Sequence, residues 1–168
     1  MIAFAARAFA ALFALLTLAA CTTKDETMTT VPIATLADTQ AQVQSRLTAI
    51  ITELATAAPT AAHDPATAKI GPAPCGDNGP EYQVTATDSV LLDGAQHRNA
   101  LAVLGEQLAL QGYTSITSRQ FSDGVGGELN LRTGDGYTAT ISSGKGNHGL
   151  AVIVASPCYR TPDGDYPG

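Results

Sequence analysis

The stretch EYQVTATDSVLLDGAQHRNALAVLGEQLALQG, residues 81–112, decides the fold of this chain. In its first part Tyr82, Val84 and Ala86 alternate with polar side chains, which predicts a half-buried strand over residues 81–92. Asp93-Gly94 ends the alternation, and residues 95–111 then repeat apolar side chains at helical spacing. Gly112 suits the left-handed position that ends a helix. The stretch therefore predicts one strand followed by one helix.

Four more segments read as strands, and they follow the helix at residues 114–121, 128–133, 137–143 and 150–156. Their connections are rich in Gly, Asp and Asn, which tolerate a positive φ in tight turns. We interpret the order as β-α-β-β-β, with the segment at residues 150–156 as a further, fourth strand after the helix. The predicted fold class is α+β, an antiparallel β-meander with one packed helix, spanning residues 75–160.

A second helix is predicted upstream, over residues 36–58, and it is amphipathic. Its apolar stripe consists of Leu36, Val43, Leu47, Ile50, Ile51 and Leu54. The stripe either docks on the downstream domain or binds a partner or a second copy. Pro59 and Pro65 delimit an expected linker over residues 59–74, and residues 161–168 are expected to be a disordered tail.

The start of the chain has the layout of a secretory signal over residues 1–20, with Arg7 before an apolar run over residues 8–20. That run is too short for a bilayer, which needs about 20 residues. Its end, Leu18-Ala19-Ala20-Cys21, resembles a bacterial lipobox, which implies lipidation of Cys21 and a membrane anchor. Residues 21–35 then form a flexible stalk. The alternative is an ordinary secreted protein whose cysteine follows two alanines.

The chain has three cysteines, so one is left over in an exported protein. If Cys21 carries lipid, Cys75 and Cys158 remain as a disulfide pair, the alternative being two buried free thiols. If the first two strands of the domain are parallel, we expect the two cysteines at opposite ends of the sheet. The segment from Cys75 to Pro80 would then have to reach back about 20 Å. Otherwise the first strand is antiparallel to its neighbour.

The net charge of −6 becomes −7 when residues 1–20 are removed, because Arg7 is the one charged residue among them. This makes nucleic acid and anionic head groups poor partners, because both require a basic patch.

Motifs for chemistry are weak. The Gly-x-Gly-x-x-Gly match at residues 144–149 joins two strands, whereas a dinucleotide site must open a helix. His63, His97 and His148 have no metal-ligand spacing and are each expected to be solvated. Asp163 and Asp165 lack the further ligands of a calcium loop. We expect no catalytic residue, no metal and no cofactor.

What remains is a polar face of the predicted sheet, built from short hydroxyl and amide side chains. Its residues are Asn130, Arg132, Thr138, Thr140 and Ser142, with Thr85 and Thr87 beside them. Such side chains can hydrogen-bond a glycan or a peptide strand. They are also what an antiparallel sheet shows to water.

The chain resembles a group of small actinobacterial cell-envelope lipoproteins of unknown function. The features that carry the resemblance are the lipobox at Cys21, Cys75, Gly112-Tyr113, Asp135-Gly136-Tyr137 and Ser156-Pro157-Cys158-Tyr159. It implies an extracytoplasmic location and a disulfide. We expect a membrane-anchored, non-catalytic lipoprotein that binds a protein or cell-wall partner. The alternatives are a cell-envelope hydrolase and a structural or inhibitor-like lipoprotein that assembles through its first helix.

Overall fold

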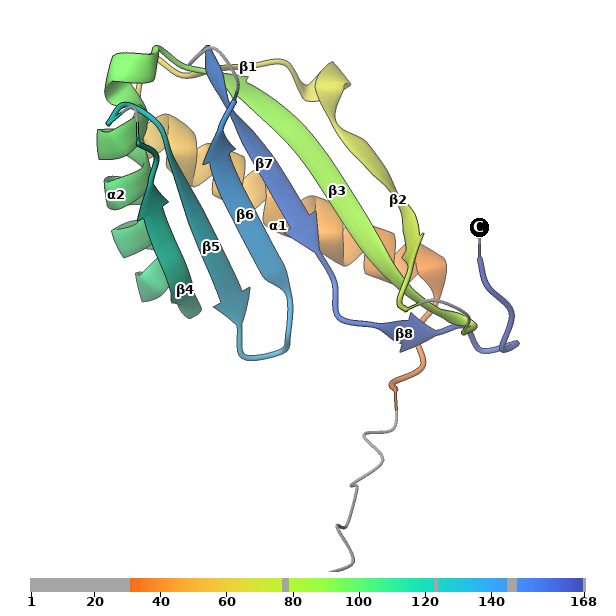
Figure 1. Cartoon of the computed structure of the whole chain (residues 1–168). Coiled ribbons are helices and arrows are strands. Elements are labelled where there is room, and N and C mark those ends of the chain that lie inside the picture. The colour runs from red at the N-terminus through yellow and green to blue at the C-terminus, as the bar shows by residue number, and fades with distance from the viewer. Residues whose placement is uncertain (1–30, 77–78, 123, 145–147, 168) are drawn as a thin grey trace, which may run out of the picture.

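The computed structural model describes residues 31–167 except 77–78, 123 and 145–147 (Figure 1). The predicted signal peptide, Cys21 and most of the predicted stalk lie outside the described residues. The elements in chain order are α1 (Leu36–Ala57), β1 (Ala62–His63), the 3-10 helix η1 (Pro65–Thr67), β2 (Lys69–Pro74), β3 (Glu81–Leu91), α2 (Gly94–Leu110), β4 (Tyr113–Gln120), β5 (Gly127–Thr133), β6 (Thr138–Ser143), β7 (Gly149–Ala155) and β8 (Tyr159–Arg160).

In the described part of the chain one eight-stranded sheet forms, with the order β1-β3-β7-β6-β5-β4, and β2 and β8 also pair with β3. Every pairing between these strands is antiparallel. The strands β4 to β7 follow one another as a meander, and β3 closes onto β7 (Figure 1). This confirms the predicted α+β class, the meander and its helix.

The predicted ends of these elements lie within two residues of the observed ones. Gly112 takes a φ of 87°, so it ends α2 in the left-handed conformation as predicted. The side chain of Asp93 accepts a hydrogen bond from the Ala95 amide and caps the start of α2. The local signals of residues 81–112 therefore determine this part of the structure.

The expectation that parallel first strands place Cys75 and Cys158 at opposite ends of the sheet is wrong. Because four antiparallel pairings separate β3 from β4, these two strands run in the same direction at different places in the sheet. The last strand, β7, nevertheless runs opposite to β3, and Ala155 pairs with Thr85 near the start of β3. Cys75 and Cys158 therefore lie at the same end of the sheet, where they form a disulfide. Cys75 directly follows β2 and is hydrogen-bonded to Glu81 at the start of β3, so Cys75 already lies at this end of the sheet.

The prediction of a linker over residues 59–74 is also wrong, because this segment contains β1, η1 and β2. Strand β2 pairs with β3 along its whole length, from Lys69 opposite Thr87 to Pro74 opposite Tyr82. The Cys75 amide donates to the Glu81 carbonyl at 3.0 Å. Because the backbone nitrogens of a strand alternate in direction, those of Pro72 and Pro74 point away from β3. A proline is tolerated there because no ladder hydrogen bond is lost.

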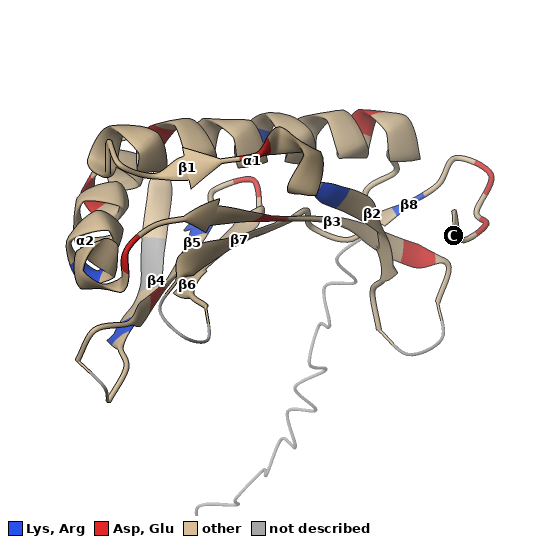
Figure 2. Ribbon diagram, turned by 90° about the horizontal axis from the view of Figure 1, so that it is seen from above, with Lys and Arg blue, Asp and Glu red and all other residues tan. Residues whose placement is uncertain are grey.

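Both helices cover one face of the sheet, and no helix of the described residues covers the other face (Figure 2). Helix α1 packs on β3 and β7, and α2 packs on β4 and β5. The predicted stripe of α1 belongs to the core, since Val43, Leu47, Ile50 and Leu54 are completely or almost completely buried. Helix α1 thus docks on the domain, and its apolar side is not available to a second copy.

The C-terminal residues continue the fold where a disordered tail was expected. The guanidinium of Arg160 in β8 donates to Glu81 at 2.8 Å, and the Ala34 amide donates to the Arg160 carbonyl at 3.0 Å. Thr161 is buried, and its carbonyl accepts from the Gly164 amide at 3.1 Å. The pairing of β8 with the start of β3 holds this end of the chain in place.

Candidate functional site

The predicted polar residues share the bare face of the sheet, as the strand register shows. One cross-strand row joins Thr87, Ile153, Thr140, Asn130 and Thr117, one residue from each strand from β3 to β4. A second row contains Thr85, Ala155, Thr138 and Arg132, and Ser142 lies opposite Ala151 and Glu128 in a third. The structure therefore brings all seven predicted face residues together.

Asn130 organises the side chains of this open face. Its amide donates to Oε1 of Glu128 at 2.8 Å and to Oγ1 of Thr117 at 3.1 Å. Its carbonyl oxygen accepts from Oγ1 of Thr140 at 2.7 Å. These bonds hold the hydroxyl and amide groups in one orientation.

The charges of the open face are partly paired. Arg119 lies 3.6 Å from Glu128, whereas Lys69 and Arg132 have no ion-pair partner among the described residues. Ile153, which is 38% exposed, stands in the row between Thr87 and Thr140. The open face thus offers hydrogen-bonding groups, an apolar residue and two unpaired cations.

A second cluster, which the sequence analysis missed, lies on the helix-covered side of the sheet. Asp88 is in the inward-facing series of β3, and its side chain is only 1% exposed. Its carboxylate accepts from Nε2 of His63 at 2.6 Å, from the Ser89 amide at 2.7 Å and from the Thr67 hydroxyl. Burial raises the pKa of Asp88, but the hydrogen bonds from Thr67, His63 and Ser89 outweigh it and hold the pKa below its usual value.

The fold brings His63 to Asp88 through β1. His63 pairs with Val90 in the sheet, which places it beside the inward-facing Asp88 although 25 residues separate the two in sequence. The signal that could have indicated this site is the phase of the strand. Asp88 continues the series of Tyr82, Val84 and Ala86, so it falls on the buried side, and a buried carboxylate requires donors.

A cavity of about 250 Å³ adjoins this pair, between α1 and the segment that contains β1 and η1. Its lining residues are Gln44, Leu47, Thr48, Ile51, Thr52, His63, Pro65, Ala68 and Asp88. A second hollow on the outer side is also lined by His63, together with Thr67 and Ser89. The imidazole is 25% exposed and therefore remains accessible.

The other two histidines differ from each other. His97 is fully buried, contrary to the expectation of a solvated residue: Nε2 donates to the Leu92 carbonyl at 3.0 Å, and Nδ1 lies 3.1 Å from the Ser143 hydroxyl. It ties the start of α2 to β6. His148 is exposed, as predicted. Among the described residues no group of three His, Cys, Asp or Glu side chains could hold a metal ion.

The Asp135-Gly136-Tyr137 turn serves to hold α1. Arg46 of α1 pairs with Asp135 at 2.6 Å and stacks over the Tyr137 ring at 4.0 Å. The Tyr137 hydroxyl donates to Gln42 at 2.6 Å. Burial raises the pKa of Tyr137, and its contact with the Tyr159 hydroxyl raises it further, so the group stays protonated and available as a donor.

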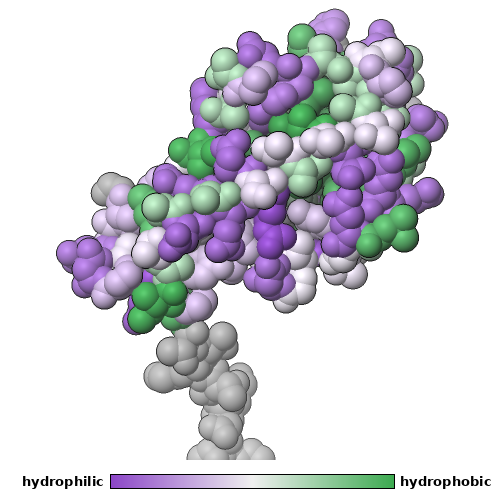
Figure 3. Space-filling view, turned by 180° about the vertical axis from the view of Figure 1, so that it is seen from behind, coloured by the Kyte–Doolittle hydropathy of each residue, from purple (hydrophilic) through white to green (hydrophobic). Residues whose placement is uncertain are grey.

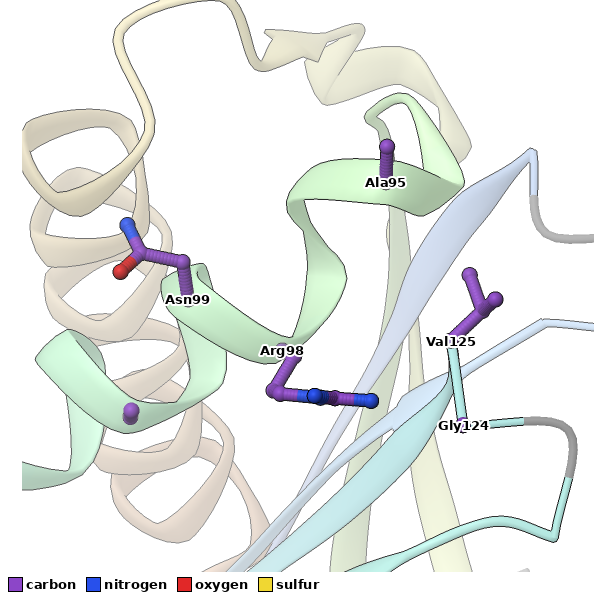
Figure 4. Close-up of a pocket in the computed structure, with 6 residues that line it drawn as sticks. Ala95, Arg98, Asn99, Gly124 and Val125 are labelled. Atoms are coloured by element: carbon purple, nitrogen blue, oxygen red, sulfur yellow. The ribbon is translucent and has the colours of Figure 1, made fainter.

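A larger hollow of about 460 Å³ lies between the start of α2 and the β4–β5 connection (Figure 4). Arg98 extends across it towards Gly124, with Asn99 and Ala95 on the helix side (Figure 4). A Cβ atom at Gly124 would stand 3.5 Å from the guanidinium, and its φ of 70° favours glycine. The described lining of this hollow contains one cation, Arg98, and no buried polar group that points to a ligand.

Comparison of the chain with protein-family models, with curated proteins and with solved structures finds no match. Within the described part of the chain, no helix has the length and apolar character needed to cross a membrane.

Proposed function

We propose that the protein is a membrane-anchored, extracytoplasmic lipoprotein that is non-catalytic and binds a protein or cell-wall partner. The observation that carries this proposal is the open face, on which Thr87, Ile153, Thr140 and Asn130 stand in one row of a rigid sheet. Half-exposed hydroxyl and amide groups that are already oriented lose little freedom on binding. Lys69 and Arg132, which have no ion-pair partner among the described residues, add positive charge, so the partner carries hydrogen-bonding groups and some negative charge.

The anchor of this proposal is Cys21, at the end of Leu18-Ala19-Ala20-Cys21. Two or three acyl chains on that residue would hold the protein durably at a membrane, since each buried methylene contributes about 0.8 kcal/mol. The disulfide between Cys75 and Cys158 supports an oxidising, extracytoplasmic location.

Two observations favour binding through the open face over assembly through α1. The apolar stripe of α1 is already buried against β3 and β7. The outer surface on the helix side is mostly hydrophilic, with separate smaller hydrophobic areas (Figure 3). A helix that recruits a second copy needs a continuous exposed apolar face.

The hydrolase alternative would use His63, because it is the histidine that a buried carboxylate orients. Nucleophilic catalysis also needs a hydroxyl or thiol in hydrogen-bond contact with the imidazole. Among the described residues, none is bonded to Nδ1 of His63. We therefore expect the purified protein to show no turnover of peptidoglycan, ester or peptide substrates.

The test is photo-crosslinking in intact cells. A photoreactive amino acid at Thr140 or Ile153 should capture a protein or cell-wall material, and the same group at Ala49, exposed on α1, should not. Adding Ile153→Arg to the protein that carries the photoreactive amino acid at position 140 should abolish capture, because a long charged side chain in the same row blocks close contact with the partner. Equal capture from Thr140 and Ala49, or capture from Ala49 alone, would refute the proposed face.

A further inference from the structure

We propose that the cavity beside Asp88 binds a small ligand that carries a primary ammonium group on a short apolar body. The cavity lies between α1 and the segment from β1 to Ala68, on the opposite side of the sheet from the open face. It is therefore a separate site, and this inference does not depend on the partner of the open face.

The first step concerns the tautomer of His63. The Asp88 carboxylate can only accept, so Nε2 of His63 carries the proton of their 2.6 Å hydrogen bond. In the neutral ring Nδ1 is then an acceptor, and it has no partner among the described residues. Asp88 thereby holds the imidazole in the form that accepts a hydrogen bond from a ligand.

The second step concerns the α1 wall of the cavity. The Thr48 hydroxyl donates to the Gln44 carbonyl at 3.0 Å, and the Thr52 hydroxyl donates to the Thr48 carbonyl at 2.8 Å. Each hydroxyl proton is thus engaged within the helix, while the oxygen can still accept. The cavity presents acceptors from two walls, which suits a ligand with several donors on one atom.

The third step concerns charge. Among the described residues no lysine or arginine lines the cavity, and Asp88 is its buried carboxylate. Asp64, just before η1, lines the other hollow beside His63 and accepts from the Ala66 amide at 2.9 Å. His63 is the facing group that can become positive. In its neutral state the site is net negative, which attracts an ammonium ion and repels a carboxylate.

The size and the remaining walls define the body of the ligand. At about 250 Å³ the cavity is smaller than the pockets of about 300–1,000 Å³ that hold drug-sized molecules. Leu47, Ile51 and Ala68 supply its apolar lining. An ammonium group with a chain or ring of a few carbon atoms fits both properties.

The experiment is an NMR titration of residues 21–168 with Cys21→Ser. The probes are hexylamine and hexanoate, each added at neutral pH. We expect saturable shifts of the His63 ring and of the Thr48 and Thr52 methyl groups with hexylamine. Hexanoate should bind at least about tenfold more weakly. Equal binding of the two probes, or no saturable shift with hexylamine, would overturn the inference.

Matched variants separate the cavity from the fold. Ala68→Leu fills the cavity and leaves His63 and Asp88 in place, and should weaken hexylamine binding by about tenfold or more. Ala66→Leu makes the same change two residues away, on an exposed residue outside the lining, and should leave binding within about twofold. His63→Phe removes the acceptor at Nδ1 and should weaken hexylamine binding, whereas the charge of Asp88 should keep hexylamine ahead of hexanoate. The backbone spectrum of Ala68→Leu shows whether this variant is folded. Unchanged hexylamine binding in the folded variant would contradict the proposed site.

Discussion

Reduction of the Cys75–Cys158 disulfide should lower the free energy of unfolding by about 4.5 kcal/mol. The two cysteines are 83 residues apart in sequence, and the cross-link removes the freedom of a loop of that length from the unfolded chain. The native state loses little, because β2 and β8 stay paired with β3 on either side of the bond. The effect should therefore appear as lower stability of an otherwise native-like protein.

The assay is urea unfolding of the chain with Cys21→Ser, in which Cys75 and Cys158 are the remaining cysteines. At an m-value of about 1.5 kcal/mol/M, a loss of about 4.5 kcal/mol moves the midpoint down by about 3 M. The oxidised protein is compared with the protein reduced and alkylated at both thiols. The variant with serine at both positions is the control, and its midpoint should match the reduced form with or without reductant.

Two results would refute this reasoning. A midpoint shift below about 0.5 M would show that the cross-link does not restrict the unfolded chain as the loop length predicts. Alkylation of both cysteines in the folded, unreduced protein would show that the bond does not form. Mass spectrometry of the unreduced protein should instead find one linked peptide pair.

Three further changes test other parts of the structure. Cys21→Ser should abolish fatty-acid labelling and leave the protein in the medium or as its precursor; a labelled, membrane-bound variant would contradict the anchor. Leu104→Ala, at a fully buried position of α2, should cost about 2–5 kcal/mol of unfolding free energy, whereas Leu110→Ala, at a position 91% exposed, should stay within about 0.5 kcal/mol in the same urea assay. The lowered pKa of Asp88 means that its contribution to stability is present above the unfolded pKa of about 3.9 and is lost as the pH falls through the folded pKa. Acid should therefore lower the wild-type midpoint more steeply than that of Asp88→Asn, and parallel pH profiles would oppose this assignment.

The periodic elements could be predicted because their signals are local. The alternation of apolar and polar residues in β3, and the apolar stripes of α1 and α2, indicate which side of each element is buried. This holds whatever the element packs against. The same alternation predicted the members of the open face, since residues two apart on a strand share a side.

The strands of the expected linker could not be predicted in this way. The sequence of β2, Lys-Ile-Gly-Pro-Ala-Pro, has no useful period and contains two prolines. It becomes a strand because β3 offers an unpaired edge beside it. Strands β1 and β8 are each two residues long and form for the same reason.

The sequence alone therefore determined which residues of each long element face inwards, where α2 ends, and which side chains could form the open face. The tertiary structure alone decided the lateral order of the strands and the meeting of His63 with Asp88. The physical reason is the distance along the chain between the residues that interact. Burial period and helix ends depend on neighbours a few residues away, whereas the contact of an edge segment with β3 depends on how distant parts of the chain have already packed.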